Sequence, residues 1–77
     1  MNRLQNILEK IFEIPGNTIT DDLSPETVPA WDSFNGLLLV SELEREFGVT
    51  FTMQEVVNVK NVGDIKKALS SHGVEDV

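Results

Sequence analysis

The chain has 77 residues, of which 13 are acidic and 6 basic, a net charge of −7 and no cysteine. This length limits it to one domain, residues 1–77, with a small core. The missing cysteine excludes disulfides and thiolate metal sites, and the acidic balance argues against nucleic acid or an anionic membrane as a partner. Residues 1–4 begin no long apolar run, so we expect no signal peptide, no membrane insertion and a cytoplasmic protein.

An amphipathic helix is predicted over about residues 2–14. Its apolar side chains recur with the three- and four-residue spacing of one helix face, and they are Leu4, Ile7, Leu8, Ile11 and Phe12. Pro15 and Gly16 then end the helix.

A long connection follows, because residues 15–32 show no sustained period. Such loops in small domains tend to be functional. Ser24 followed by Pro25 has the pattern of a short helical turn with serine as its cap. Four apolar side chains are expected to hold the connection against the core: Ile19, Leu23, Val28 and Trp31.

Three further helices are predicted. The second covers about residues 33–47 and ends at Gly48. A short third helix covers about 53–58, because Thr52 and Glu55 have the spacing of a capping box. The last begins after a cap at Asn61 and ends near 72–73. The fold class is therefore all-α: a small four-helix bundle, with three longer helices, a short third helix and a long loop between helices one and two.

The second helix has two apolar faces when residues are placed at about 100° intervals. One face holds Gly36, Leu39, Val40, Leu43 and Phe47. The opposite face holds Phe34, Leu37, Leu38 and Ser41, and acids occupy its flanks. One face must enter the core. The other is either an exposed binding strip or is covered by the third helix or the long loop.

Ser33 stands at the predicted start of the second helix. Free backbone N–H groups and the positive end of the helix dipole favour a bound phosphate at such a position. Ser33 is therefore a candidate site for a phosphate-linked group. The alternative is that it only caps the helix, because serine is a preferred N-cap residue.

Three short segments occur in an informative order and spacing. They are Asp-Ser-Phe at 32–34, Glu-Arg-Glu-Phe-Gly-Val at 44–49, and Asn-Val-Gly-Asp-Ile at 61–65. Together they resemble the acyl carrier protein family of phosphopantetheine-binding carriers over nearly the whole chain. The family usually has Asp-Ser-Leu, so Phe34 is a conservative departure.

The resemblance implies that a phosphopantetheinyl transferase attaches 4′-phosphopantetheine from coenzyme A to Ser33. Acyl groups then travel as thioesters on the thiol of this arm. Asp32 is expected to contact the transferase or its metal, or else to complement the helix dipole. The chain is expected to be a carrier and not an enzyme, with no catalytic residue and no metal site.

The exposed face of helix two is the predicted docking strip for the enzymes that load and transfer the acyl group. The docking residues would be Phe34, Asn35, Leu37, Leu38, Ser41, Glu42, Glu44 and Arg45. Residues 21–46 hold seven acids and one base, so we expect partners with basic patches and an association that weakens with salt. The chain is expected to be a monomer.

Carriers of this family can shelter the acyl chain in the apolar interior between their helices. The residues that would line such a pocket are Leu39, Leu43, Val56, Val57, Val59 and Val62. The alternative is that these side chains form ordinary core.

Several positions depart from the pattern of fatty-acid carriers, which hold acids along the exposed face of helix two. Asn35, Leu38 and Arg45 stand where acids are usual, and Glu42 stands where a small residue is common. Such swaps penalise wrong partners, which favours a specialised pathway such as polyketide, peptide or acylated-glycan synthesis. Two alternatives stay open: an aminoacyl or peptidyl carrier, and an unmodified acidic helical interaction module.

Two other polar features receive simpler predictions. His72, the only histidine, is expected to complement the dipole at the end of the last helix. Asp21 and Asp22 are expected to be a solvated pair, because their spacing is not that of a calcium-binding loop.

Overall fold

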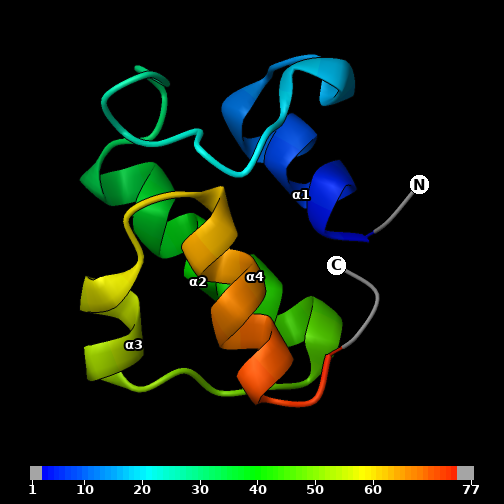
Figure 1. Cartoon of the computed structure of the whole chain (residues 1–77), viewed down its shortest axis with the longest axis vertical. Helices are drawn as coiled ribbons and strands as arrows, with labels where there is room; N and C mark the ends of the chain where they lie inside the picture. The colour runs from blue at the N-terminus through cyan, green and yellow to red at the C-terminus, as the bar shows by residue number, and fades with distance from the viewer. Residues whose placement is uncertain (1–2, 75–77) are drawn as a thin grey trace.

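The computed structural model describes residues 3–74, which form four α-helices and one short 3₁₀-helix (Figure 1). The helices are α1 (Arg3–Phe12), α2 (Ser33–Phe47), α3 (Met53–Asn58) and α4 (Val62–Ser71), and the 3₁₀-helix is η1 (Gly16–Thr18). No strand occurs within residues 3–74. The predicted all-α bundle with a short third helix is confirmed.

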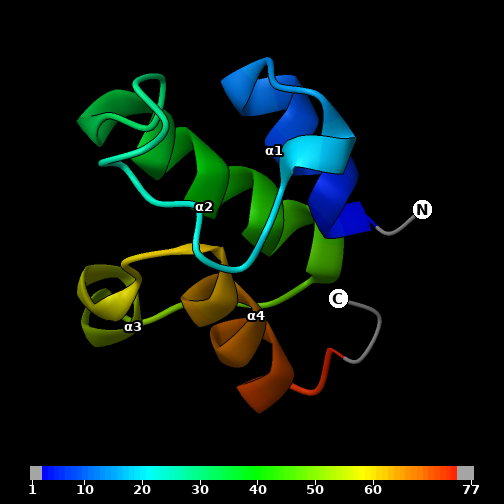
Figure 2. The same ribbon diagram turned by 45° about the horizontal axis from the view of Figure 1, so that its top comes forward.

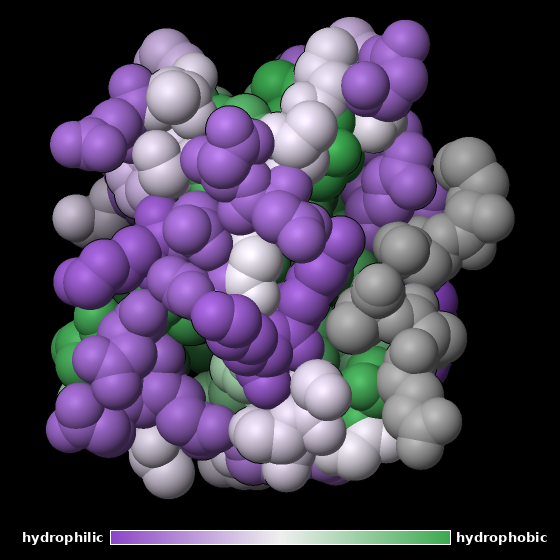
Figure 3. All heavy atoms as spheres, in the orientation of Figure 1, coloured by the Kyte–Doolittle hydropathy of each residue, from purple (hydrophilic) through white to green (hydrophobic). Residues whose placement is uncertain are grey.

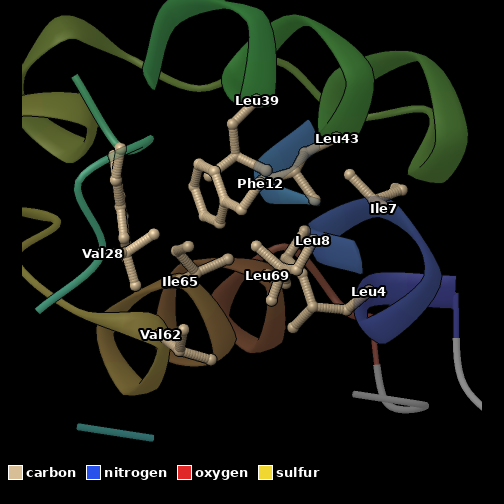
Figure 4. Close-up of a cluster of buried hydrophobic side chains, with 11 residues drawn as sticks. Leu4, Ile7, Leu8, Phe12, Val28, Leu39, Leu43, Val62, Ile65 and Leu69 are labelled. Atoms are coloured by element: carbon tan, nitrogen blue, oxygen red, sulfur yellow. The ribbon is translucent and has the colours of Figure 1, made fainter. Parts of the chain in front are cut away.

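The hydrophobic core lies between α1, α2 and α4 (Figure 4). Leu39 and Leu43 of α2 point towards the side chains of α1, where the Phe12 ring stacks on Trp31 with 5.0 Å between ring centroids. The buried apolar side chains are Leu4, Ile7, Leu8, Phe12, Val28, Trp31, Leu39, Leu43, Val62, Ile65 and Leu69. Full burial of one large aliphatic side chain contributes roughly 1.5–3 kcal/mol, so this cluster is the main source of stability.

The first helix is shorter than predicted. It ends at Phe12, because Glu13 adopts a left-handed backbone with φ of 55° and cannot continue the helix towards Pro15. The predicted extension to residue 14 is therefore wrong. Its predicted start at residue 2 lies outside the described residues.

The connection between α1 and α2 is held against the core as predicted. Val28 and Trp31 are buried, and Ile19 and Leu23 pack partly buried against the same cluster. The predicted turn at Ser24 forms: the Glu26 N–H donates to Ser24 Oγ at 3.3 Å, and the Val28 N–H donates to the Ser24 carbonyl at 2.9 Å. The turn does not continue into a helix, and α2 begins only at Ser33.

Two backbone hydrogen bonds join this connection to the start of α4. Val62 N–H donates to the Leu23 carbonyl at 3.0 Å, and Gly63 N–H donates to the Asp21 carbonyl at 2.8 Å. A Cβ atom on Gly63 would lie 3.3 Å from the Asp21 carbonyl oxygen. Glycine therefore permits the close approach of the two segments.

The predicted ends of the later helices are confirmed. Gly48 follows α2 in a left-handed conformation, with φ of 66°. At the start of α3, Glu55 N–H donates to Thr52 Oγ1 at 3.1 Å, and Thr52 N–H donates to Glu55 Oε1 at 2.8 Å. Asn61 caps α4, and its Oδ1 accepts the N–H of Asp64 at 2.8 Å.

α3 stands apart from the core. Both ribbon views place it on the opposite side of the molecule from α1 (Figures 1 and 2). None of its residues is buried. The position of α3 creates the pocket described below, because its inner side faces α2 and α4 without filling the space between them.

Candidate functional site

Ser33 is the first residue of α2, and Asp32 is the N-cap. The Asp32 carboxylate accepts the N–H of Asn35 at 2.9 Å, and the Asp32 carbonyl accepts the N–H of Gly36 at 2.8 Å. Ser33 is exposed, and its hydroxyl has no hydrogen-bond partner within residues 3–74. The alternative in which Ser33 only caps the helix is wrong, because Asp32 provides the cap.

The start of α2 suits a bound phosphate. The N–H groups of Ser33 and Phe34 precede the first helical hydrogen bond, which Gly36 donates to Asp32. Backbone N–H groups at this position, together with the positive end of the helix dipole, favour an anion. A phosphodiester on the exposed Ser33 hydroxyl therefore fits the residues that surround it.

Asn35 has a structural role that the sequence did not indicate. Its Nδ2 donates to the Ala30 carbonyl at 2.7 Å, in a partly buried position. This bond attaches the first turn of α2 to the loop before Ser33. Asn35 therefore fixes the backbone around Ser33, and its role in docking stays a prediction.

A pocket of about 190 Å³ opens beside Ser33 between α2, α3 and α4. Four of its residues were predicted: Leu39, Leu43, Val56 and Val59. The others are Trp31, Ser33, Gly36, Leu37, Val40, Phe51, Glu55, Ile65 and Ala68. An apolar cavity of about 150 Å³ is large enough to hold a benzene ring, so the pocket has room for a small apolar group.

Some of the pocket residues could have been found from the sequence and others could not. Gly36 and Val40 share a helix face with Leu39 and Leu43, so the period of α2 indicates them. Phe51 precedes α3, whereas Ile65 and Ala68 lie on α4, and they meet the residues of α2 only through the packing of these segments. The local pattern of the sequence does not predict that packing.

Two predicted pocket residues lie elsewhere. Val57 is 56% exposed on the outer side of α3. Neighbouring helical residues point about 100° apart, so Val56 and Val57 cannot both face the pocket. Val62 is buried in the core and borders a smaller cavity with Leu4 and Leu8 of α1 (Figure 4).

The outer face of α2 is exposed next to Ser33. The exposed fractions are 74% for Phe34, 67% for Leu37 and 40% for Leu38. Ser41 is also exposed, and Arg45 has 75% of its side chain in solvent. The alternative in which α3 or the long loop covers Leu37 and Leu38 is therefore wrong.

Two acids of the predicted docking strip are engaged within the chain. Glu42 forms an ion pair with Arg45, and only 21% of its side chain is exposed. Glu44 is partly buried, and its Oε2 accepts the N–H of Phe51 at 2.8 Å. Glu44 therefore connects α2 to the segment that leads into α3.

His72 connects the end of α4 to α3. Its Nε2 lies 2.9 Å from Glu55 Oε2, and its ring meets the Phe51 ring edge-on with 5.3 Å between centroids. The Thr52 backbone N–H holds the pKa of Glu55 below its ordinary value, against a smaller opposing effect of burial, and His72 lowers the pKa further. His72 thus does more than end a helix, because it also fixes a residue of the pocket wall.

The described residues offer no metal site, since no group of three or more His, Asp or Glu side chains in 3–74 could hold an ion. Asp21 pairs with Lys66, with 2.7 Å between Oδ1 and Nζ, and Asp22 accepts a hydrogen bond from Thr20. Both acids are exposed, so they are solvated as predicted, and each also has a polar partner within the chain. No helix in the described part of the chain has the length and apolar character needed to span a membrane.

Comparisons with known proteins agree with this geometry. The sequence matches the family described as the phosphopantetheine attachment site over residues 2–69. An acyl carrier protein (Rv0033) from Mycobacterium tuberculosis has a similar solved structure, with a TM-score of 0.80 and 23% sequence identity over 90% of this chain and 92% of that one. The search of curated proteins gave no significant match. The chain belongs to the phosphopantetheine-attachment family.

Membership of this family defines the class of protein. The chain is a carrier domain rather than an enzyme, and 4′-phosphopantetheine is its expected covalent cofactor. The structural match confirms that the fold is that of an acyl carrier protein. The family resemblance inferred from the segments at 32–34, 44–49 and 61–65 is therefore confirmed.

Proposed function

We propose that Ser33 carries the 4′-phosphopantetheine and that the protein transports acyl intermediates as thioesters between enzymes of a specialised biosynthetic pathway. The observation that carries this proposal is the position of the Ser33 hydroxyl. It is exposed at the start of α2, is not used for capping, and borders an apolar pocket. A group attached there has both an anion-favouring helix end and an apolar shelter within reach.

The attachment step uses Ser33 as a nucleophile. Its Oγ forms a bond to the coenzyme A phosphorus that bears the pantetheine. The P–O bond of the pyrophosphate bridge breaks, adenosine 3′,5′-bisphosphate leaves, and the hydroxyl proton passes to a base. Within residues 3–74 no base contacts the hydroxyl, so we assign the base and the metal to a phosphopantetheinyl transferase. Asp32 is exposed beside Ser33 and can contact that enzyme or its metal while capping α2.

The bound group supplies a thiol that holds the cargo as a thioester. Tethering raises the effective concentration of the cargo at a partner's active site. Leu39, Leu43, Val56 and Val59 are the proposed walls for the first carbons of an acyl chain. The apolar lining supports an acyl cargo over a charged one, because an unpaired charge would lose hydration there.

The specialised pathway is proposed because two residues of the docking strip differ from those of fatty-acid carriers. Leu38 and Arg45 are exposed on α2 where carriers of fatty-acid synthesis usually have acids. Such a surface disfavours the enzymes of bulk fatty-acid synthesis. A generic fatty-acid ketosynthase should therefore elongate the acyl form much more slowly than that of its own carrier, and equal rates would contradict this assignment.

We further propose that the protein works as a monomer in the cytoplasm. Sedimentation at several concentrations checks the first point, and a mass that rises with concentration would contradict it. Fractionation of the source cells checks the second, and recovery of the protein outside the cytoplasmic fraction would contradict it.

The decisive experiment measures the intact mass after incubation with coenzyme A and a broad-specificity phosphopantetheinyl transferase. We expect a gain of one phosphopantetheine on the wild type and none on Ser33→Ala. Ser41→Ala is the matched control, because Ser41 is also exposed on α2. If the folded wild type gains no mass, or if Ser33→Ala gains the same mass, Ser33 is not the attachment residue.

A further inference from the structure

Trp31 presents an unpaired hydrogen-bond donor to the pocket beside Ser33. The residue is only 8% exposed and lines the pocket, and its Nε1 has no hydrogen-bond partner within residues 3–74. Every fully enclosed side-chain nitrogen or oxygen in that part of the chain does have a partner, so the indole N–H keeps a small accessible surface. A donor that is mostly buried is poorly hydrated, and an acceptor that enters the pocket would pair with it.

The indole is held in a fixed position. The Phe12 ring stacks on it, with 5.0 Å between ring centroids and 28° between the planes. The Trp31 backbone N–H donates to the Val28 carbonyl at 2.9 Å, and Asn35 Nδ2 donates to the carbonyl of the neighbouring Ala30 at 2.7 Å. These contacts place the donor before any ligand arrives, so little side-chain freedom is lost when a ligand binds.

The nitrogen edge of the indole faces the first turn of α2. A Cβ atom on Gly36 would lie 3.7 Å from Trp31 Nε1 and 3.8 Å from Cδ1. Glycine therefore leaves room beside the N–H for an atom of a ligand. Gly36 and Ser33 stand three residues apart on one side of the helix, a spacing that separates Cβ positions by about 5–6 Å. A group that leaves Ser33 and enters the pocket thus passes close to the indole N–H.

The rest of the pocket wall offers little polarity to a ligand. Within residues 3–74, its lining residues with a polar side-chain atom are Trp31, Ser33 and Glu55. Ser33 would hold the arm, and the two Glu55 carboxylate oxygens already contact the Thr52 N–H and His72. The outer face over α4 is mostly hydrophilic by contrast (Figure 3). The Trp31 N–H is therefore the donor in this wall that is open to a ligand.

We propose that the Trp31 indole N–H donates a hydrogen bond to a carbonyl oxygen of the 4′-phosphopantetheine arm or of its acyl cargo. The proposal rests on the proposed attachment at Ser33. A neutral carbonyl suits this wall, because it loses less hydration in an apolar pocket than a carboxylate does. The arm supplies amide carbonyls, and the cargo supplies the thioester carbonyl and any oxo group further along. Trp31 would orient the bound group, and Gly36 would keep the space beside the N–H open.

The test follows the indole proton by NMR, since Trp31 is the only tryptophan of the chain. We expect this proton to move downfield and to exchange with water about tenfold more slowly once its acceptor is in place. Intact mass confirms each loaded form. The arm alone, a hexanoyl form and a 3-oxohexanoyl form separate the sources of the carbonyl. A response to the arm alone identifies an amide, a response that begins with hexanoyl identifies the thioester, and a response confined to 3-oxohexanoyl identifies the cargo.

Two variants control the NMR response. Gly36→Ala keeps the indole but fills the space beside its N–H, so the response should be lost, although alanine favours the helix more than glycine does. Ser33→Ala, treated with the same transferase and coenzyme A, receives no arm and should keep the signal of the unloaded protein.

A third variant tests the contact without the indole signal. Trp31→Phe keeps an aromatic ring that can stack on Phe12 but lacks the N–H. Its gain in melting temperature from the unloaded to the responding loaded form should be smaller than the gain of the wild type by about 4 °C. A purely structural loss is the same in the unloaded and loaded forms, so it cancels from this difference.

The outcomes separate the contact from the attachment. If mass spectrometry shows complete loading but the indole proton responds in none of the loaded forms, the contact is overturned and the attachment at Ser33 stands. A full response in Gly36→Ala, or equal gains in melting temperature in the wild type and Trp31→Phe, would overturn it as well. If the wild type receives no arm, the attachment fails and the contact fails with it.

Discussion

The core between α1, α2 and α4 is held by fully buried apolar side chains, whereas α3 contributes none of these and is joined to its neighbours by partly buried residues and polar contacts. Leu4, Val62 and Leu69 are at most 1% exposed, but none of the residues of α3 is buried. The polar contacts that join α3 to its neighbours are the bond from the Phe51 N–H to Glu44 and the bond between Glu55 and His72, whereas the capping box stabilises the start of α3 itself. The carrier thus combines a well-packed scaffold under Ser33 with a lightly attached wall beside it.

This difference has a functional meaning. α3 has six residues, and an isolated helix of that length is not stable in water. It therefore depends on its neighbours and is expected to open at a lower free energy than the core. A pocket with one such wall can accept cargo while the scaffold keeps Ser33 in place.

The largest effect is expected from a substitution at Leu69 in the core, which has no exposed surface. Leu69→Ala removes buried side-chain volume from the core and should lower the free energy of unfolding by about 2–5 kcal/mol. Urea denaturation measures this loss. The control is Leu37→Ala, which should change stability by less than about 0.5 kcal/mol because Leu37 is exposed. Equal losses at the two positions would mean that the core and the outer face do not differ as described.

The next largest effect is the gain in stability expected when an acyl chain enters the pocket. This prediction rests on the proposed attachment at Ser33. Each methylene that leaves water contributes up to about 0.8 kcal/mol. A hexanoyl cargo should therefore stabilise the carrier by about 1–3 kcal/mol more than an acetyl cargo. Ala68 lines the pocket and is partly buried, so Ala68→Leu should reduce this gain. Thermal unfolding of both acyl forms measures it, and identical melting temperatures in the wild type would exclude a sheltered cargo.

A smaller effect is expected at the cap of α3. Thr52→Ala removes the side chain that accepts the Glu55 N–H and should cost about 1 kcal/mol. The loss should be local: amide exchange should accelerate in α3 and not in α1. Thr50→Ala makes the same chemical change outside the cap and serves as the control. If exchange accelerates equally in all helices, α3 is not an independent element.

The sequence predicted the ends of α2, α3 and α4 because each depends on one or two residues with a definite backbone role. Gly48 accepts a positive φ, and Thr52 and Asn61 supply side-chain oxygens to free N–H groups. The end of α1 was not predictable in this way. Glu13 adopts φ of 55°, a conformation that its residue type does not favour.

The pocket could be predicted only in part. The period of α2 indicates Leu39 and Leu43, but the valines at 56, 57, 59 and 62 look alike in the sequence. Which of them face inward depends on how α3 is rotated. The bonds from Glu44 to Phe51 and from Glu55 to His72 join residues 7 and 17 positions apart and fix α3 against its neighbours. A local pattern does not contain such contacts.

The smallest effect is expected in the pH dependence of the melting temperature, which tests whether the charge of Glu55 helps to hold α3. The Thr52 N–H, and to a lesser degree His72, favour the charged form of Glu55 and hold its pKa below the ordinary value of 4.5. A carboxyl whose pKa is lower in the folded state stabilises the fold above its unfolded pKa, and this contribution is lost as pH falls through the folded pKa. The wild type should therefore lose more melting temperature between about pH 5 and about pH 3 than Glu55→Gln.

Glu55→Gln is a suitable comparison because glutamine can also complete a capping box. The other carboxyl groups of the chain titrate in both proteins, so their effect cancels in the difference between the two curves. Parallel curves would mean that the charge of Glu55 does not hold α3. A steeper curve for the wild type would show that a carboxylate at the surface of the pocket wall helps to fix the part of the molecule that buried side chains do not reach.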